Sequence, residues 1–351
     1  MKKQVTIQDI AERTQVSKTT VSRYLNGKFD FMSNETKEKI AAAISEMGYR
    51  QNRMANSLRT NQSGLIGIVM SNVMSSQTPQ LLGSICDTCA EHGIKIIIVN
   101  SEKDPEKEKT LVYELLEQRV DGLLVLSGYN LEFYQELDRD EVPVVLADRI
   151  PLGCCLDAVA INHAESVRYV VGHLLKQGFE RIVVLKKPHR NPYNTPQIRV
   201  DATISTCREF FGNDEHCEVI TMDFGSQGEQ NCDKYDKLTE ILHEYYSKSA
   251  DCPTAIFVAE AVIMNIVACC YYRAAISIND NFTISGYSDW DMGSLIVPPI
   301  STIEQPIKQM GQRATEKLIK RIEQSKKSDT SGEHPVETSL LTCRISIQPK
   351  D

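Results

Sequence analysis

A cluster of hydrogen-bond donors on one predicted helix is the strongest chemical signal in this sequence. The donors fall on the helix side opposite Val21 and Leu25, which are spaced i, i+4 and form an apolar stripe. Short and long donors of this kind suit the base edges and phosphates of a DNA major groove. The alternative is an ordinary surface helix pair, but helix signals and donors coincide within a short span, which favours DNA binding. The donors are Lys18, Thr19, Ser22 and Arg23.

Three short helices must position these donors. Thr6 is the expected N-cap of the first helix, with Asp9 three residues on, and Ser17 is the expected N-cap of the second. A third helix is predicted to begin near Ser33 and to end before Gly48. The apolar stripes of the three helices predict a small closed core. Its members are Ile10, Ala11, Val21, Leu25, Ile40, Ala43, Ile44 and Met47.

The charge distribution separates the first sixty residues from the rest of the chain. Residues 1–60 hold eleven Lys and Arg against six Asp and Glu, a net charge of +5. The whole chain carries −8, so residues 61–351 carry −13. A basic segment on an acidic body is typical of a nucleic-acid module joined to a part that does not touch phosphate.

Length and composition allow two or three globular domains, since the 351 residues are 41% hydrophobic. No apolar run reaches membrane-spanning length, and the first residues lack the apolar region of a signal peptide. We therefore expect a cytoplasmic protein with no membrane partner.

The eleven cysteines are expected to be free thiols in a reducing compartment. Cys86 and Cys89 form a Cys-x-x-Cys pair without a second pair at zinc-finger spacing. Two buried structural cysteines are favoured there over metal or redox chemistry. The seven histidines show no metal-ligand spacing, so we expect no metal and no cofactor.

From residue 64 the sequence alternates between strand-like and helix-like segments, which predicts parallel sheets built by crossover connections. The units form two similar series and therefore two lobes. The expected strands are 65–70, 95–99, 122–126, 143–147, 181–185, 218–221, 254–258 and 282–287, with one more strand in 298–324.

A two-lobed α/β body binds small ligands at the carboxyl ends of its strands. No dinucleotide-binding glycine motif, phosphate loop or Gly-x-Ser-x-Gly motif follows any expected strand. We therefore expect no catalytic residues and no enzyme activity. Candidate lining segments are 71–72, 127–128, 148–149, 186–199, 223–224, 260 and 288–290.

The chain closely resembles the LacI/GalR family of bacterial transcriptional regulators. The most specific part is residues 6–27, in which 16–23 (VSKTTVSR) nearly match the family signature. Further matching motifs are Asp121-Gly122, Asp148-Arg149, residues 253–257 (PTAIF), Gly286-Tyr287 and residues 298–306 (PPISTIEQP). Residues 22–30 weakly resemble the branch that regulates ketodeoxygluconate or gluconate use.

The resemblance implies an α/β fold with an N-terminal helix-turn-helix head and a two-lobed, periplasmic-binding-protein-like body. It places the head at 1–49, a hinge helix or linker at 50–63, and an effector-binding and dimerisation body at 64–351. The first lobe is expected to span about 64–160 and 291–325, and the second about 161–290 and 330–351. The implied partners are double-stranded operator DNA, a small sugar or sugar-acid effector and a second copy of the chain, as a homodimer or tetramer.

The resemblance also assigns DNA-binding residues in the head and hinge. Leu58 matches the leucine that enters the central base step from the minor groove, at the cost of unstacking; the alternative is a linker residue that packs on a neighbour. Gln51 stands where the family usually has proline, which removes a fixed turn before the hinge. The implied set is Thr6, Ser17, Lys18, Thr19, Thr20, Ser22, Arg23, Asn26, Tyr49, Asn52, Ala55 and Leu58.

For the effector, the family positions are less well preserved. Ser288 stands where the family usually has aspartate, while Arg199 matches the family arginine, a combination that favours an anionic ligand. Glu260 argues against it, and the nearby basic residues are equally compatible with solvated loop charges. The implied set is Ser75, Ser76, Gln77, Asp148, Tyr193, Thr195, Arg199, Phe224, Glu260 and Ser288.

Two classes of function stay open at this point. The first is a repressor of carbohydrate-metabolism genes that is controlled by its effector. The second is a solute-binding sugar receptor or small-molecule enzyme with an N-terminal helical appendage. A receptor would need an export signal and an enzyme would need a nucleophile–base pair, and the sequence offers neither.

Overall fold

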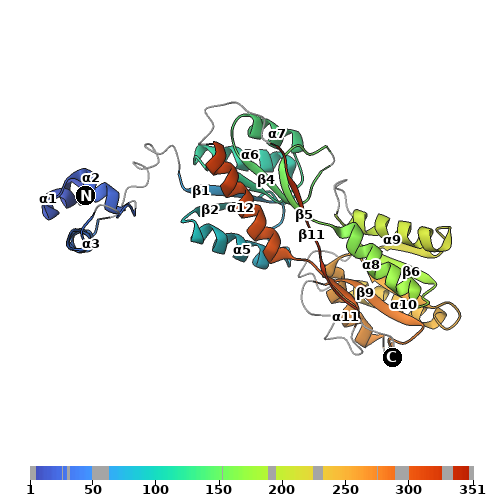
Figure 1. The fold of residues 1–351 in the computed structure, drawn as a ribbon. Coiled ribbons are helices and arrows are strands. Elements are labelled where there is room, and N and C mark those ends of the chain that lie inside the picture. The colour runs from blue at the N-terminus through green and yellow to red at the C-terminus, as the bar shows by residue number, and fades with distance from the viewer. Residues whose placement is uncertain are drawn as a thin grey trace. The chain divides into compact units, whose positions relative to one another are not determined.

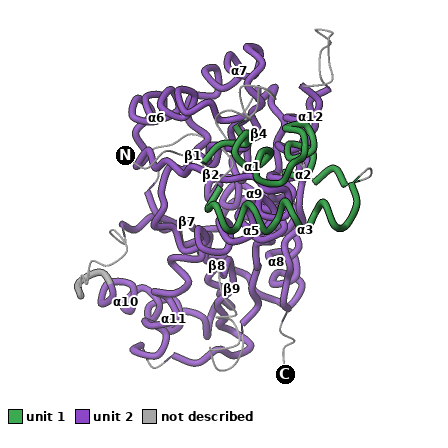
Figure 2. The backbone as a smooth tube through the Cα atoms, turned by 90° about the vertical axis from the view of Figure 1, so that its left-hand side faces the viewer, with its two compact units in different colours: residues 1–63 green, residues 64–351 purple. Residues whose placement is uncertain are grey.

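The chain divides into two compact units, residues 1–63 and residues 64–351 (Figure 2). The computed structural model describes residues 5–25, 27–29, 32–49, 63–151, 153–188, 195–223, 232–274, 276–288, 300–325 and 335–347.

Three helices make up the described part of the first unit: α1 (Ile7–Thr14), α2 (Lys18–Leu25) and α3 (Asn34–Met47). Helix α1 begins with a capping box, in which the Thr6 side chain accepts the Asp9 amide and the Asp9 carboxylate accepts the Thr6 amide. Ser17 precedes helix α2, and its Oγ accepts a hydrogen bond from the Thr20 amide at 3.1 Å. These bonds pair amides that would otherwise lack partners at the helix N-termini. Both predicted N-caps are confirmed.

Helix α3 closes the head. Ser33 Oγ accepts the Thr36 amide at 3.2 Å, and Gly48 ends the helix in the left-handed region at φ +61°, as the sequence predicted. The core between the helices is small, so each helix contributes only one or two fully buried side chains. The buried members are Ile10, Ala11, Val21, Ile40 and Ala43, with Leu25, Ile44 and Met47 partly buried around them.

The first lobe of the second unit is a six-stranded parallel sheet in the order β11-β5-β4-β3-β1-β2, flanked by four helices. Its inner strands are apolar along their length because helices cover both faces. The strands are β1 (Leu65–Met70), β2 (Lys95–Asn100), β3 (Leu123–Val125), β4 (Val144–Asp148), β5 (Asp157–Ile161) and β11 (Thr338–Leu341). The helices are α5 (Thr78–Glu91), α6 (Pro105–Glu117), α7 (Leu131–Arg139) and α12 (Ile307–Ser325).

The second lobe is another six-stranded sheet in the order β12-β10-β9-β8-β6-β7, parallel except for the antiparallel pair β10 and β12. Gly286 in β9 has φ +144°, and a Cβ there would lie 2.2 Å from the Val258 carbonyl oxygen of β8, so only glycine fits. The strands are β6 (Arg181–Lys186), β7 (Cys217–Thr221), β8 (Thr254–Val258), β9 (Phe282–Ser288), β10 (Thr302–Glu304) and β12 (Arg344–Ser346). The helices are α8 (His163–Lys176), α9 (Thr195–Phe211), α10 (Cys232–Lys248) and α11 (Ala261–Arg273).

Each lobe is a three-layer α/β/α sandwich (Figure 1). In the first lobe, α5 and α12 share one core while α6 and α7 contribute to another on the opposite face of the sheet. In the second lobe, α8 and α9 cover one face and α10 and α11 the other. One of these cores is continuous through both lobes, from Ile66 of β1 to Phe257 of β8. The predicted α/β class with two parallel-sheet lobes is confirmed.

The end of the chain corrects the expected lobe boundaries. Strand β10 lies within the expected 291–325 portion of the first lobe, yet it belongs to the second sheet. Strand β11 lies within the expected 330–351 portion of the second lobe, yet it pairs with β5 in the first sheet. Strands β5, β11 and β12 were not predicted as strands. The chain therefore passes between the lobes three times: after β5, between β10 and α12, and between β11 and β12.

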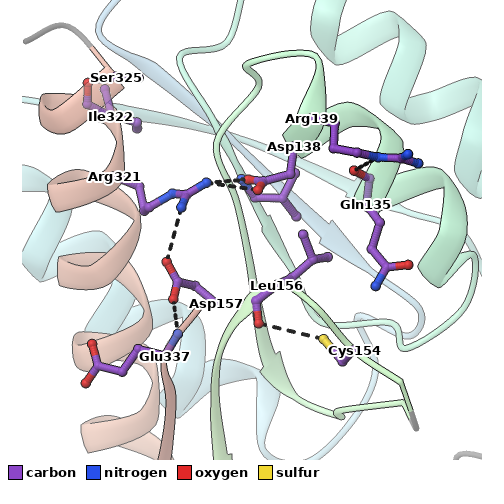
Figure 3. Close-up of polar contacts among 11 residues, drawn as sticks. Gln135, Asp138, Arg139, Cys154, Leu156, Asp157, Arg321, Ile322, Ser325 and Glu337 are labelled. Atoms are coloured by element: carbon purple, nitrogen blue, oxygen red, sulfur yellow. Dashed lines mark hydrogen bonds and ion pairs between the residues drawn. The ribbon is translucent and has the colours of Figure 1, made fainter. Parts of the chain in front are cut away.

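A buried ion network holds α12 onto the first lobe (Figure 3). Arg321 of α12 donates from Nη2 to both carboxylate oxygens of Asp138, at 2.8 and 2.9 Å. Its Nη1 lies 3.7 Å from Asp157 Oδ2. Asp157 Oδ1 also accepts the Glu337 amide at 2.7 Å. The Arg321 and Asp157 side chains are only 13% and 3% exposed, so each charge depends on the others to replace water.

No helix among the described residues is long and apolar enough to cross a membrane.

Candidate functional site

The exposed side of α2 carries the donors that the sequence singled out. Lys18, Thr19 and Arg23 are exposed, whereas Val21 on the opposite side is fully buried in the head core. Ser22 and Tyr24 are half-buried. Lys18 and Arg23 form no ion pair with another described residue of the head, so both cations face solvent and are available to an anionic partner.

The other described head residues that were expected to bind DNA make contacts within the head itself. The side chain of Thr6 belongs to the capping box of α1. The hydroxyls of Ser17 and Thr20 lie 2.9 Å apart and hydrogen-bond to each other. Tyr49 packs against the head core, and burial raises the pKa of its hydroxyl. Four expected residues lie outside the described residues: Asn26, Asn52, Ala55 and Leu58.

A cavity of about 640 Å³ lies between the two lobes of the second unit. Most of its walls come from the carboxyl ends of parallel strands, where the doubly wound architecture predicts a ligand site. The lining residues are Met70, Ser71, Asn72, Ser75, Gln77, Thr78, Leu81, Lys103, Leu126, Tyr129, Asp148, Arg149, Lys187, Pro188, Thr195, Pro196, Glu260, Val262 and Met310.

The cavity includes half of the expected effector residues: Ser75, Gln77, Asp148, Thr195 and Glu260. Ser76 is not among its lining residues, and Tyr193 and Phe224 lie outside the described residues. Arg199 and Ser288 do not line it either, because they are only 5% and 2% exposed and lie within the packed body. The expected pairing of Arg199 with a ligand carboxylate stays a prediction.

Charged groups from both lobes surround the cavity. Arg149 Nε lies 3.8 Å from Asp148 Oδ2, and its Nη1 donates to the Ser127 carbonyl at 3.3 Å. Asp148 has φ +73°, a strained conformation for a residue with a side chain, and such strain collects at binding sites. In the second lobe, Glu260 Oε1 accepts the Lys187 amide at 2.9 Å.

Lys103 and Tyr129 are lining residues that the sequence argument missed. Lys103 lies just beyond the carboxyl end of β2, and the candidate segments omitted that strand end. A uniform rule of inspecting the residues after every predicted strand would have found it. Together, Lys103, Arg149 and Lys187 bring three cationic side chains to a cavity that also holds the carboxylates of Asp148 and Glu260.

The side chains that line the cavity are suited to binding a small ligand. Hydroxyl, amide and charged groups suit a small polar ligand, and Leu81, Leu126 and Val262 supply apolar surface. Its lining residues include no histidine or cysteine. Across the part of the chain that the structure describes, no group of three or more His, Cys, Asp or Glu side chains could hold a metal ion.

Comparison with known proteins finds one family match within each of the two units. Residues 6–52 match the bacterial regulatory proteins of the lacI family, and residues 171–346 match a periplasmic binding protein-like domain. A probable HTH-type transcriptional regulator EndR from Paenibacillus polymyxa is 28% identical over 320 residues, which cover 91% of each chain. The HTH-type transcriptional regulator KdgR of Bacillus subtilis is 28% identical over 92% of each chain. A lac repressor dimer bound to operator and the anti-inducer ONPF has a TM-score of 0.76 at 24% identity over 98% of each chain.

Fold and site together define a class of protein: a helix-turn-helix head joined to a two-lobed body with a ligand cavity between its lobes. The chain belongs to the lacI family of bacterial regulatory proteins. The expected resemblance and the expected function as a transcriptional regulator are confirmed. The relatives are regulators by name, which gives the receptor or enzyme alternative no support.

Proposed function

We propose that this protein represses carbohydrate-metabolism genes by binding operator DNA as a homodimer, and that a small sugar acid in the interlobe cavity controls that binding. Relatives include ribose operon repressors from two bacteria, and a similar fold occurs in a transcriptional regulator CelR–cellobiose complex. Since its partner is chromosomal DNA, the proposal places the protein in the cytoplasm.

The solvent-facing surface of α2 is the observation that supports the DNA-binding part of the proposed function. Capping at Ser17 and burial of Val21 fix the helix, so Lys18, Thr19 and Arg23 are presented by a rigid element. Arginine and lysine can pair with guanine in a major groove, and threonine can contact either a base or a methyl group. In this proposal Ser22, Tyr24 and Asn26 either contact phosphates, which positions the DNA, or pack against neighbouring residues of the head.

The segment between the two units completes the operator contact in this proposal. On the operator, Asn52 and Ala55 would form part of a hinge helix, and Leu58 would enter the central base step from the minor groove. Two copies of the chain would place two hinge segments side by side at the centre of a near-palindromic operator, because a two-fold symmetric protein matches two-fold symmetric DNA.

The proposed effector class rests on the cavity charges. Lys103 and Arg149 approach from the first lobe and Lys187 from the second, so a carboxylate between them would draw the lobes together. The two carboxylates of the cavity already have partners: Asp148 lies beside Arg149, and Glu260 holds a backbone amide. A ligand carboxylate in the cavity would therefore be attracted by the cations and would not be repelled by two unpaired carboxylates.

A sugar acid is therefore expected to bind more tightly than the matched neutral sugar. The full chain would first be screened by thermal shift with such pairs, D-gluconate and D-glucose among them, because a ligand at 100 times its dissociation constant adds about 2.7 kcal/mol of stability. Calorimetry would then compare both members of the best pair. Lys103→Met is expected to weaken the acid about tenfold and to leave the neutral sugar unchanged.

Lys308→Met is the matched control, since Lys308 is exposed on α12 and does not line the cavity. It should change neither affinity. Preference for the neutral member of the pair, or equal losses for both members in Lys103→Met, would contradict the sugar-acid assignment.

A further inference from the structure

One carboxylate is fully buried inside the first lobe. Glu108 of α6 is 0% exposed, and no ion pair among the described residues of this lobe includes it. Burying a carboxylate without a cation is costly unless hydrogen bonds replace the lost water. An apolar side chain would fill the same space at less cost, so the role of this carboxylate lies in the bonds that it accepts.

Four side-chain donors converge on Glu108. Its Oε1 accepts hydrogen bonds from Ser127 Oγ and Tyr134 Oη, both at 2.9 Å, and from Asn130 Nδ2 at 3.4 Å. Its Oε2 accepts a bond from Ser101 Oγ at 3.1 Å. Burial, together with the Glu108 carboxylate, raises the pKa of Tyr134, so the tyrosine hydroxyl stays protonated and donates. Both carboxylate oxygens are therefore in use.

Three of the four donors come from two segments of the first-lobe wall of the cavity. Ser101 directly follows β2, and Lys103, two positions later, lines the cavity. Ser127 follows β3, and Tyr129, two positions later, also lines the cavity. The carboxylate thus ties the end of β2 to the end of β3, where each segment contributes a side chain to the cavity.

The backbone of these two segments needs support. Glu102 and Lys103 have φ of +55° and +68°, and Asn130 has φ of +53°. The left-handed region is unfavourable for residues with a side chain, so it persists only where surrounding contacts hold it. The ion pair between Lys107 and Glu102 is 41% and 69% exposed, and such exposed pairs contribute little. The buried bonds to Glu108 are therefore the contacts best able to hold the two segments.

Arg149 depends on the same arrangement. Its Nη1 donates to the Ser127 carbonyl at 3.3 Å, and a Cβ at Gly128 would lie 3.0 Å from Arg149 Cβ. The placement of Ser127 by Glu108 therefore also bears on where the Arg149 guanidinium lies. Both cationic side chains that the first lobe brings to the cavity, Lys103 and Arg149, rest on segments that this carboxylate holds.

We propose that Glu108 is a positioning residue for the interlobe cavity: it holds the segments after β2 and β3 so that Lys103, Tyr129 and Arg149 form the first-lobe wall. This rests on the proposed function only in taking the cavity as the effector site. The bonds from Ser101 and Ser127 then shape the cavity. The bond from Tyr134 serves stability alone, because this residue belongs to α7 and does not line the cavity.

Ser127→Ala and Tyr134→Phe form a matched pair that separates the two roles. Each removes one fully buried hydroxyl that donates to Glu108 Oε1 at 2.9 Å. Both variants should therefore lower the midpoint of urea unfolding of the full chain by similar amounts. Only Ser127→Ala should disturb the two cavity segments.

Hydrogen exchange measured by mass spectrometry, without ligand or DNA, detects that disturbance. The Ser101 and Leu126 amides report on the two segments, since each bonds to a carbonyl of β1 at 2.8 Å. Ser127→Ala should speed exchange in peptides that contain them about tenfold, because a hydrogen bond to a carboxylate is lost. Tyr134→Phe should leave these peptides unchanged and speed exchange only within α7.

Two substitutions of Glu108 itself extend the test. Glu108→Met removes all the acceptor oxygens and should speed exchange in both segments by more than Ser127→Ala does. Glu108→Gln should bring exchange back to within about threefold of the parent, because its amide oxygen can replace Oε1 and its NH2 group can donate to Ser101 Oγ. The Ser101 hydroxyl can then donate to the Met70 carbonyl, which lies 3.3 Å away. The matched pair decides the matter if Glu108→Met does not fold.

Calorimetry with D-gluconate adds a measurement that a purely structural role would not change. Ser127→Ala should weaken gluconate binding about fivefold or more, whereas Tyr134→Phe should bind within about twofold of the parent. Equal weakening in the two variants would mean that general stability, and not the placement of the cavity wall, sets the affinity.

Parent-like exchange at both segments in Ser127→Ala would overturn the proposal, as would equal rises in Ser127→Ala and Tyr134→Phe. Since the exchange measurement needs neither effector nor operator, such a result would leave the proposed repressor function standing. Absence of gluconate binding to the parent would count against the proposed effector class, and the exchange result would still decide the role of Glu108.

Discussion

Replacing Arg321 with methionine is expected to lower the free energy of unfolding by about 3–5 kcal/mol. The substitution keeps most of the apolar stem but leaves Asp138 and Asp157 facing each other without a cation. Asp157 is the costlier of the two, because its side chain is only 3% exposed. Urea unfolding of parent and variant measures the difference; urea is chosen because an ionic denaturant would screen the charges being tested.

Arg344→Met is the control for this prediction. Arg344 pairs with Glu304 at 3.7 Å, but its side chain is 79% exposed, and exposed ion pairs contribute at most about 1 kcal/mol. A loss for Arg321→Met as small as that for Arg344→Met would mean that α12 is held by its apolar face alone.

The second large effect is expected at the DNA-binding surface. Thr19→Ala or Arg23→Ala should each weaken operator binding by about 1–3 kcal/mol and affect random DNA much less, because contacts to base edges exist only on the matching sequence. Fluorescence anisotropy with both duplexes measures the two losses. Both residues are exposed on α2, so the head should fold unchanged, which circular dichroism checks.

Lys28→Ala separates base reading from charge in this experiment. Lys28 is exposed but lies beyond the end of α2, so its loss should weaken both duplexes alike and reduce the dependence on salt. If Arg23→Ala behaves like Lys28→Ala on both duplexes, then Arg23 contacts phosphate and the base-reading assignment is wrong.

The head could be read from the sequence because its signals are local. Thr6, Ser17, Ser33 and Gly48 act on amides or carbonyls within a few residues of themselves, so residue type and spacing fix the helix ends. The buried residues at each helix face then define the core without further information.

The path of the chain between the lobes could not be read in the same way. Strand β5 (DAVAI) is a short run without a distinguishing period, and β11 and β12 are strands only because β5 and β10 lie beside them. Thr338 pairs with Ala158 and Arg344 pairs with Glu304, partners that are 180 and 40 residues away, and no local pattern encodes such a separation.

The sequence predicted only some of the residues that line the cavity, and the reason is related. The rule that ligands bind after parallel strands located Asp148 and Glu260, since it depends only on strand ends. Whether a side chain then points into the cavity depends on long-range packing. Arg199 turns toward Gln305, a residue that follows it by more than a hundred positions, and spacing alone could not distinguish that contact from a ligand contact.

The whole chain is expected to bind a specific operator under effector control. Selection from a random duplex library with the full-length protein, followed by salt titration of the selected duplex and a scrambled duplex of equal composition, tests it most directly. We predict a near-palindromic selected sequence bound about a thousandfold more tightly than the scrambled one, with affinity for both falling as salt rises. The sugar acid that gives the largest thermal shift should change only the specific affinity. Equal affinity for the two duplexes at every salt concentration would contradict the account.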